Sequence, residues 1–340
     1  MKFNTEITRQ ISNEFKRIPL LIFKSLLLLY IIGISLIIDY RIICYGLDSS
    51  HFFATNYFFY KHIKFGPDVI WTYGPFGFLI KPVNIGHNLD IAIFFQVIVW
   101  IIFCSALVYF SLRHRISILQ LCSFAFFFSF ARGTGLLFDY FLCLFIIFFL
   151  SLSFFLEKWK PLYLFALFFS GLLWMIKFDL AFAVLFALAL FIVTRYSIDR
   201  NEAWKINILT IVLIPFIFVV SYIIYNPSFT DMILYLKGAY HISSGYSLHS
   251  FSGKKIELII AMSFGILYLS FVYFLHKARQ VSFFIALVLI GPLFVAFKRG
   301  FVRQDTHVAT FFSFSLVSLA LIFLFTDIRK NIQGNAKQKV

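Results

Sequence analysis

Ten long apolar runs, separated by short polar segments, dominate this chain of 340 residues. A helix needs about 20 apolar residues to cross the hydrocarbon core of a membrane. The pattern therefore predicts an all-α, polytopic membrane protein with about ten transmembrane helices. The runs cover residues 20–38, 91–112, 116–131, 136–156, 162–176, 180–194, 206–225, 256–275, 281–297 and 308–325, of which the third, fifth and sixth are short for a full crossing.

The composition excludes a soluble domain. Hydrophobic residues make up 61% of the chain and charged residues only 13%, whereas charged residues make up about 25% of an ordinary soluble domain. The net charge of +15 would suggest nucleic-acid binding in a soluble protein. Here the cytoplasmic flanks of membrane helices account for much of it, and no basic run of the nucleic-acid type is present. No nucleic-acid partner is expected.

The distribution of Lys and Arg predicts the orientation in the membrane. Most of the 30 Lys and Arg residues fall on one side if both termini are cytoplasmic, as the positive-inside rule requires. The first apolar run is too long for a cleaved signal peptide and is interpreted as an uncleaved anchor. We therefore expect one transmembrane domain over residues 1–326, a short cytoplasmic tail over 327–340, and larger outer pieces at 39–90, 226–255 and 298–307.

The longest stretch outside the apolar runs is residues 47–88, within the first outer piece. Residues 49–64 look amphipathic, with apolar side chains such as Phe52 and Phe59 on one face and polar ones such as His51 and Asn56 on the other. This pattern favours an interfacial helix that lies along the membrane surface. The string 71–79 that follows contains Tyr73 and the Gly-Pro pair of a strong turn signal. It could plug between helices.

Two acids of this stretch are candidate catalytic groups. Asp48 lies shortly after the first apolar run, and Asp68 follows the turn at 65–67. A carboxylate at the membrane rim can accept a proton from a sugar hydroxyl or hold a divalent cation that masks a phosphate. The alternative is that both are ordinary solvated loop acids. The sequence alone assigns no metal or other cofactor.

A second candidate site is the charged segment 298–307. It carries the cations Lys298, Arg299 and Arg303 together with Asp305 and His307. Arg and Lys suit a phosphate or pyrophosphate group, Arg by bidentate contact. The alternative is that the topology is shifted by one crossing and that this segment is a cytoplasmic anchor.

Four further charges lie near the predicted outer ends of the apolar runs: Arg132, Asp139, Lys177 and Asp179. They could line the same cavity or pair with one another. The turns at 132–135 and 177–179 are expected to dip into the membrane. Such dips require protein or a water-filled cavity to satisfy the backbone.

Other sequence signals are weak or absent. The four cysteines lie in or beside apolar runs without CxxC spacing and are expected to be small buried side chains. The histidines of the 226–255 piece lack clear metal-ligand spacing. The chain contains no GxxxxGK[ST], GxGxxG, HExxH or GxSxG motif, which argues against nucleotide hydrolysis, dinucleotide redox chemistry, zinc proteolysis and elbow-serine hydrolysis.

Two strings carry a resemblance to a known group of proteins. Residues 65–79 read FGPDVIWTYGPFGFL, and residues 300–307 read GFVRQDTH. They are similar to the FGxDVxxTYGPLGFL and GFVRxDxH strings of a family of uncharacterised bacterial polytopic membrane proteins. An acid directly after the first crossing and a long first outer loop also resemble the GT-C glycosyltransferases. Unlike many of those enzymes, this chain has no second acid beside Asp48 and no soluble outer domain.

The resemblance implies a glycosyltransferase of the bacterial inner membrane with its active face outward. It would transfer a sugar from a polyprenyl-phosphate donor to a glycan or lipid acceptor. Asp48, with Asp68, would act on the acceptor hydroxyl, and Lys298, Arg299 and Arg303 would hold the donor phosphate. The alternatives are a glycan polymerase of related chemistry, a transporter or flippase of lipid-linked or anionic solutes, and a non-catalytic membrane subunit. A transporter would be expected to carry its charges near the bilayer midplane.

Overall fold

The structure is a computed structural model, and it is all-helical in the residues that it describes. These are residues 2–43, 45–114, 116–155, 159–197, 200–245, 253–278, 280, 282–302, 304 and 307–326. In this part of the chain the helices are α1 (Lys2–Ser35), α2 (Leu47–Tyr60), the 3-10 turn η1 (Gly77–Leu79), α3 (Asn88–Arg113), α4 (Ile118–Gly133), α5 (Phe138–Phe155), α6 (Trp159–Ile176), α7 (Phe178–Tyr196), α8 (Arg200–Tyr225), α9 (Phe229–Gly245), α10 (Lys255–Lys277), α11 (Ser282–Val302) and α12 (His307–Leu324).

The apolar helices fit a multi-pass membrane protein. Among the described residues, seven helices are long and apolar enough to cross a bilayer, namely α1 from Ile18 onward, α3, α7, α8, α10, α11 and α12. The shorter apolar helices α4, α5 and α6 match the third, fourth and fifth predicted runs. The sixth run was expected to be short, and this was wrong, because α7 adds residues at both ends of it. The total of ten crossings stays a prediction.

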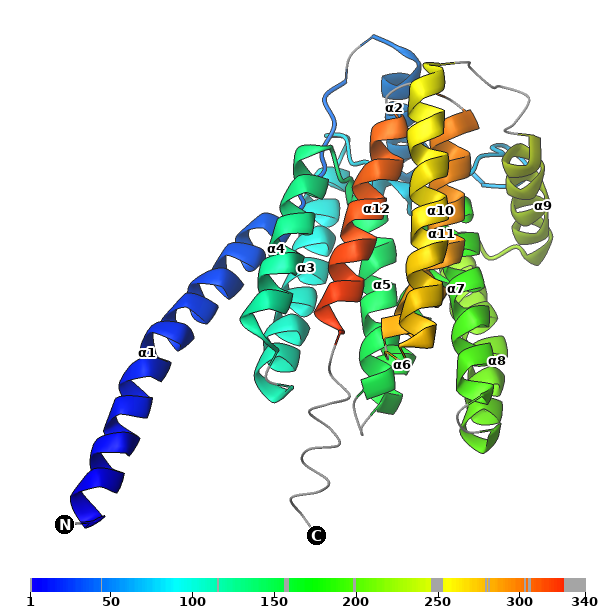
Figure 1. Cartoon of the computed structure of the whole chain (residues 1–340). Helices are drawn as coiled ribbons and strands as arrows, with labels where there is room; N and C mark the ends of the chain where they lie inside the picture. Colours follow the sequence, from blue (N-terminus) through cyan, green and yellow to red (C-terminus); the bar gives the residue numbers. More distant parts are fainter. Residues whose placement is uncertain are drawn as a thin grey trace.

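The helices form one bundle around α5. Neighbouring pairs include α4 with α12, α11 with α12, α7 with α11, and α6 with both α5 and α8. Nearly every side chain of α5 that the structure describes is buried, as expected of a helix that is apolar all round and covered by others. α1 diverges from the bundle towards its N-terminal end (Figure 1). It also exposes many large apolar side chains, which suits a lipid-facing helix.

The start of α1 and the end of α12 lie on the same side of the bundle. α1 begins and α12 ends at one end, and α2 lies at the other (Figure 1). An even number of crossings would produce this arrangement. The placement of the termini relative to the membrane stays a prediction.

Two elements outside the apolar runs differ in detail from the expectation. The helix expected over residues 49–64 is present as α2, which ends at Tyr60. Asn56 was assigned to its polar face, and this was wrong, because Asn56 is fully buried. Its amide donates to the Lys81 carbonyl at 2.8 Å and accepts from the Val83 amide at 3.0 Å, which ties α2 to the next loop. The outer piece 226–255, which no apolar run marks, contains the helix α9.

The interruption between α6 and α7 is buried inside the protein. Lys177 has an extended backbone conformation between the two helices, and its side chain is only 2% exposed. The string 71–79 reaches this break from the first outer piece. The Phe178 amide donates to the Thr72 carbonyl at 2.9 Å, and the Phe76 amide donates to the Met175 carbonyl at 2.8 Å. The string therefore satisfies backbone groups that a break within an apolar bundle would otherwise leave unpaired.

The described cysteines behave as expected. Cys104 and Cys143 are buried, Cys122 is partly buried, and all three are free thiols. Cys44 lies outside the described residues. The cysteines add no cross-link or metal site to the described part of the fold.

Candidate functional site

A large cavity lies where the string 71–79 meets the ends of several helices. Its volume is about 1420 Å³. The residues that line it come from the segment after α1, the start of α2, the α4–α5 turn, the starts of α7 and α12, and the ends of α9 and α11. Because the contributing ends of α4, α7, α11 and α12 flank one end of the bundle, the cavity lies at a rim rather than halfway along the helices.

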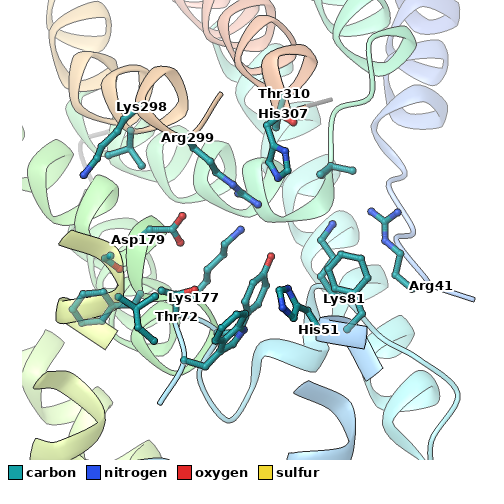
Figure 2. A pocket seen from close by; sticks show the side chains of 18 of the residues that line it. Arg41, His51, Thr72, Lys81, Lys177, Asp179, Lys298, Arg299, His307 and Thr310 are labelled. Atoms are coloured by element: carbon teal, nitrogen blue, oxygen red, sulfur yellow. The ribbon is translucent and has the colours of Figure 1, made fainter. Parts of the chain in front are cut away.

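The lining is strongly cationic. Five Lys or Arg side chains and two histidines line the cavity, while Asp179 is the one acid among the described lining residues. Figure 2 shows these side chains converging from different elements. The cationic residues are Arg41, Lys81, Lys177, Lys298 and Arg299, and the histidines are His51 and His307.

One buried carboxylate behind the lining pairs with two of these cations. Asp139, at the start of α5, is fully buried, and its Oδ2 atom lies 2.8 Å from Lys177 Nζ and 3.1 Å from Arg299 Nη1. These three residues come from α5, the α6–α7 break and α11. Two alternatives were open for Arg132, Asp139, Lys177 and Asp179, namely a shared cavity or pairing. Among the described residues, Asp139 and Lys177 form an ion pair, while Lys177 and Asp179 line the cavity. Two cations share one carboxylate, so the group keeps an excess positive charge beside the cavity.

Lys177 connects α6 to α7 and does not belong to either helix. Its ammonium group remains charged in this position. Burial and the neighbouring Arg299 both act to lower the pKa of the Lys177 ammonium group. The carboxylates of Asp139 and Asp179 and the neighbouring Tyr73 act in the opposite direction and raise this pKa above its usual value. The cation is therefore a fixed feature of the site rather than a switch near neutral pH.

A second carboxylate that is shared by two cations was not predicted from the sequence. Asp39 accepts from Lys81 Nζ at 2.6 Å and lies 3.1 Å from Arg41 Nε, while its backbone amide donates to Gln96 Oε1 at 2.9 Å. Lys81 is almost fully buried, and both cations also approach the ring of Phe52. The available sequence signal was a lysine placed within the apolar surroundings of residues 78–85. A cation in such surroundings needs a partner or a ligand.

Aromatic rings complete the wall. The ring centroids of Trp71 and His51 lie 4.6 Å apart in an edge-to-face arrangement, and Tyr73 faces Lys177. Trp71 and His51 also line a smaller hollow of about 350 Å³ beside the main cavity. Cationic groups next to aromatic faces suit a ligand that combines an anionic group with a ring of the sugar type.

The predicted site residues separate into those that the fold brings together and those that it does not. The cavity collects Tyr73, Lys177, Lys298, Arg299 and His307. In contrast, Arg132 does not line it, and its guanidinium donates to the carbonyl groups of Leu36 and Leu136 at 3.5 and 3.4 Å.

The two acids predicted to be catalytic, Asp48 and Asp68, are not among the described residues that line the main cavity. Asp68 is exposed and lines the smaller hollow. Asp48 lies in the first turn of α2, and its neighbour Ser49 lines the main cavity, but the side chain of Asp48 lies outside the described part of the structure. Arg303 and Asp305 also lie outside it.

The described residues contain no group of three or more His, Cys, Asp or Glu side chains that could hold a metal ion. The possibility of a divalent cation at the predicted acids therefore gains no support from the described side chains. No protein-family model, no curated protein and no solved structure matches the chain. The cavity itself carries the functional argument.

Proposed function

We propose that this protein is a membrane glycosyltransferase of the GT-C type. It transfers a sugar from a polyprenyl-phosphate donor to a glycan or lipid acceptor at the outer face of a bacterial inner membrane. The observation that carries the proposal is the cavity of about 1420 Å³, with its five Lys and Arg side chains, at one end of an apolar helical bundle.

The cationic lining fits the phosphate of such a donor. Arg299 and Lys298, in the last turns of α11, and Lys177, at the start of α7, border the same space. Guanidinium and ammonium groups bind phosphate by charge-assisted hydrogen bonds. The N-terminal end of α7 at the cavity adds the positive end of a helix dipole. These groups would also stabilise the negative charge that develops on the departing phosphate.

The position of the cavity favours a lipid-linked donor over a soluble one. The cavity is built on the ends of helices whose other faces are apolar. A polyprenyl chain could remain in the bilayer while its phosphate reaches the cations. The aromatic side chains of Trp71 and Tyr73 offer faces against which a sugar ring can pack. The sequence predicts Asp48 as the group that activates the acceptor, and the side chain of Asp48 lies outside the described part of the structure.

A transporter or flippase of anionic solutes is the second candidate, and one observation favours it. The start of α7 borders the cationic cavity, as the half-helix ends of transporters face their substrate. The position of the described cavity charges at one end of the bundle argues for the enzyme, because a transporter site lies near the midplane.

The test is a comparison of surface glycans and lipids by mass spectrometry in wild-type cells, a deletion strain, and strains that carry Lys298→Ala or Arg299→Ala. The glycosyltransferase proposal expects deletion to remove one sugar from a defined glycan or lipid. It also expects both variants to reduce that sugar at unchanged protein levels.

A deletion that leaves every glycan and lipid unchanged would overturn the proposal. Accumulation of the complete lipid-linked product on the inner leaflet would instead identify a flippase. Lys277→Ala is the matched control, because Lys277 is an exposed lysine at the C-terminal end of α10 that does not line the cavity.

A further inference from the structure

Asp179 differs from the other buried or half-buried acids around the cavity. It is half-buried in the first turn of α7 and lines the cavity. Its Oδ1 atom accepts the backbone N–H of Leu180 at 3.0 Å. In Figure 2 its carboxyl group points towards the space between the cationic side chains.

The other described acids beside the cavity, Asp139 and Asp39, already have cationic partners. Asp139 is shared by Lys177 and Arg299, and Asp39 is shared by Lys81 and Arg41. Neither carboxylate belongs to the cavity lining. Each is held by two cations, so it is a poor proton acceptor. Both acids position cations rather than act on a substrate.

Asp179 forms no ion pair with any residue that the structure describes, although it is close enough to Lys177 and Arg299 to interact with their charges. Among the described residues, nothing bonds to the second carboxylate oxygen of Asp179, which leaves it available to a ligand beside the groups that would hold a phosphate. The cavity therefore holds both a proton acceptor, Asp179, and the cations that could bind the leaving phosphate.

We propose that Asp179 is the catalytic base of the transfer reaction, an inference that rests on the proposed glycosyltransferase function. The carboxylate accepts the proton of the acceptor hydroxyl as that oxygen forms a bond to the anomeric carbon of the donor sugar. The bond from the anomeric carbon to the phosphate oxygen breaks, and its electron pair leaves with the phosphate. Lys177 and Arg299 stabilise the leaving phosphate, and Asp179 later releases its proton to water.

The position of Asp179 on a helix suits this role. A base has to lie within hydrogen-bond reach of the proton that it removes, and a rigid element holds it there better than a loop does. Asp68 is exposed on the smaller hollow, apart from the main lining. The base predicted from the sequence was Asp48, so substitutions at Asp48 and Asp179 must be compared directly.

The experiment measures product and donor binding in the same set of variants. Asp179→Asn, Asp179→Glu and Asp48→Asn are expressed in the deletion strain, and the missing sugar is measured by mass spectrometry. Binding of farnesyl phosphate, a short polyprenyl phosphate, is measured on the purified proteins. The matched control is Asp90→Asn, which removes an acid from the first turn of α3 at an exposed position outside the cavity.

We expect Asp179→Asn to reduce the transferred sugar by about 100-fold, the lower range for loss of a general base. Farnesyl phosphate binding should be unchanged or tighter, because a negative charge leaves a cationic cavity. Asp179→Glu should restore part of the product, and Asp90→Asn should match wild type.

Two results would overturn the inference. Wild-type product from Asp179→Asn would show that the base lies elsewhere, and joint loss of product and farnesyl phosphate binding would show that Asp179 is structural. In both cases a sugar lost on deletion would leave the proposed function standing. That function fails separately if deletion changes no glycan or lipid.

Discussion

The ammonium group of Lys177 lies 4.8 Å from the centre of the Tyr73 ring, and the backbones of these two residues form an isolated antiparallel bridge. A cation over an aromatic face is stabilised by the ring quadrupole. The pair joins the first outer piece to the α6–α7 break, and both members line the cavity. The geometry of the cavity wall thus depends on a loop distant in sequence.

Removing the shared carboxylate should destabilise the protein. Asp139→Asn leaves Lys177 buried without its carboxylate, and breaking a buried pair by removing one partner costs about 3–5 kcal/mol. We expect a clearly lower thermal unfolding midpoint for the detergent-purified variant. The double variant Asp139→Asn, Lys177→Gln should recover part of the loss. An unchanged midpoint for Asp139→Asn would contradict the role of this carboxylate in holding the two cations.

The close approach of the string 71–79 to α6 should make Gly74 intolerant of a side chain. A Cβ atom at Gly74 would overlap the Met175 carbonyl oxygen and lie 2.6 Å from the Tyr235 hydroxyl. We expect Gly74→Ala to displace the string, at a cost of about 1–3 kcal/mol, and to reduce product formation along with thermal stability.

The matched glycine control is Gly265→Ala in α10, where a Cβ atom meets nothing within 4 Å. Alanine at this helical position should be neutral or slightly stabilising. Equal effects of Gly74→Ala and Gly265→Ala would show that the string does not depend on the close contact.

Lys298 should contribute to ligand affinity and not to stability. Its side chain is exposed within the cavity lining, on the last turns of α11. We expect Lys298→Ala to weaken farnesyl phosphate binding by about tenfold to a hundredfold, as loss of one charge-assisted contact implies. The difference from wild type should shrink as salt is added, because salt screens exposed charges. An affinity equal to that of wild type at low salt would exclude Lys298 from the phosphate site.

The predicted orientation can be tested by labelling introduced cysteines. In a variant whose four native cysteines are replaced by alanine, Lys64→Cys should react with a membrane-impermeant maleimide in intact cells. Lys277→Cys should react only after permeabilisation. Both lysines are exposed and lie outside the apolar interior of the bundle. The reverse labelling pattern would place the cavity on the cytoplasmic face and contradict the proposed outer active site.

The sequence predicts the helices well, because each apolar run is long enough to specify one. The sequence predicts less well the helices that no apolar run marks and the polar residues that are buried. α9 follows a turn at Pro227 and mixes Tyr, His and Ser side chains with apolar ones, so no apolar run marks it. Asn56 is polar by type, yet it is buried because the carbonyl of Lys81 and the amide of Val83 satisfy it. The burial of such a polar residue depends on hydrogen-bond partners distant in the sequence, so the local sequence pattern cannot predict it.

The candidate site follows the same division. Lys177, Lys298 and Arg299 could be singled out because charges beside apolar runs need partners or ligands. Their common relation to Asp139 could not be predicted, because it depends on α5, α7 and α11 being neighbours in space. The sequence did not identify Lys81 as a site residue for a similar reason. Its partner Asp39 precedes α2 in the sequence, whereas Lys81 follows it.

The insertion of residues 71–79 against the α6–α7 break has a consequence for biogenesis. Translation proceeds from the N-terminus, so the string leaves the ribosome well before Met175 and Phe178, whose backbone groups it pairs with. Until those partners are translated and enter the membrane, the first outer segment cannot reach its final conformation. Ribosome-bound intermediates truncated before α7 should expose this segment to external protease, whereas longer intermediates should protect it.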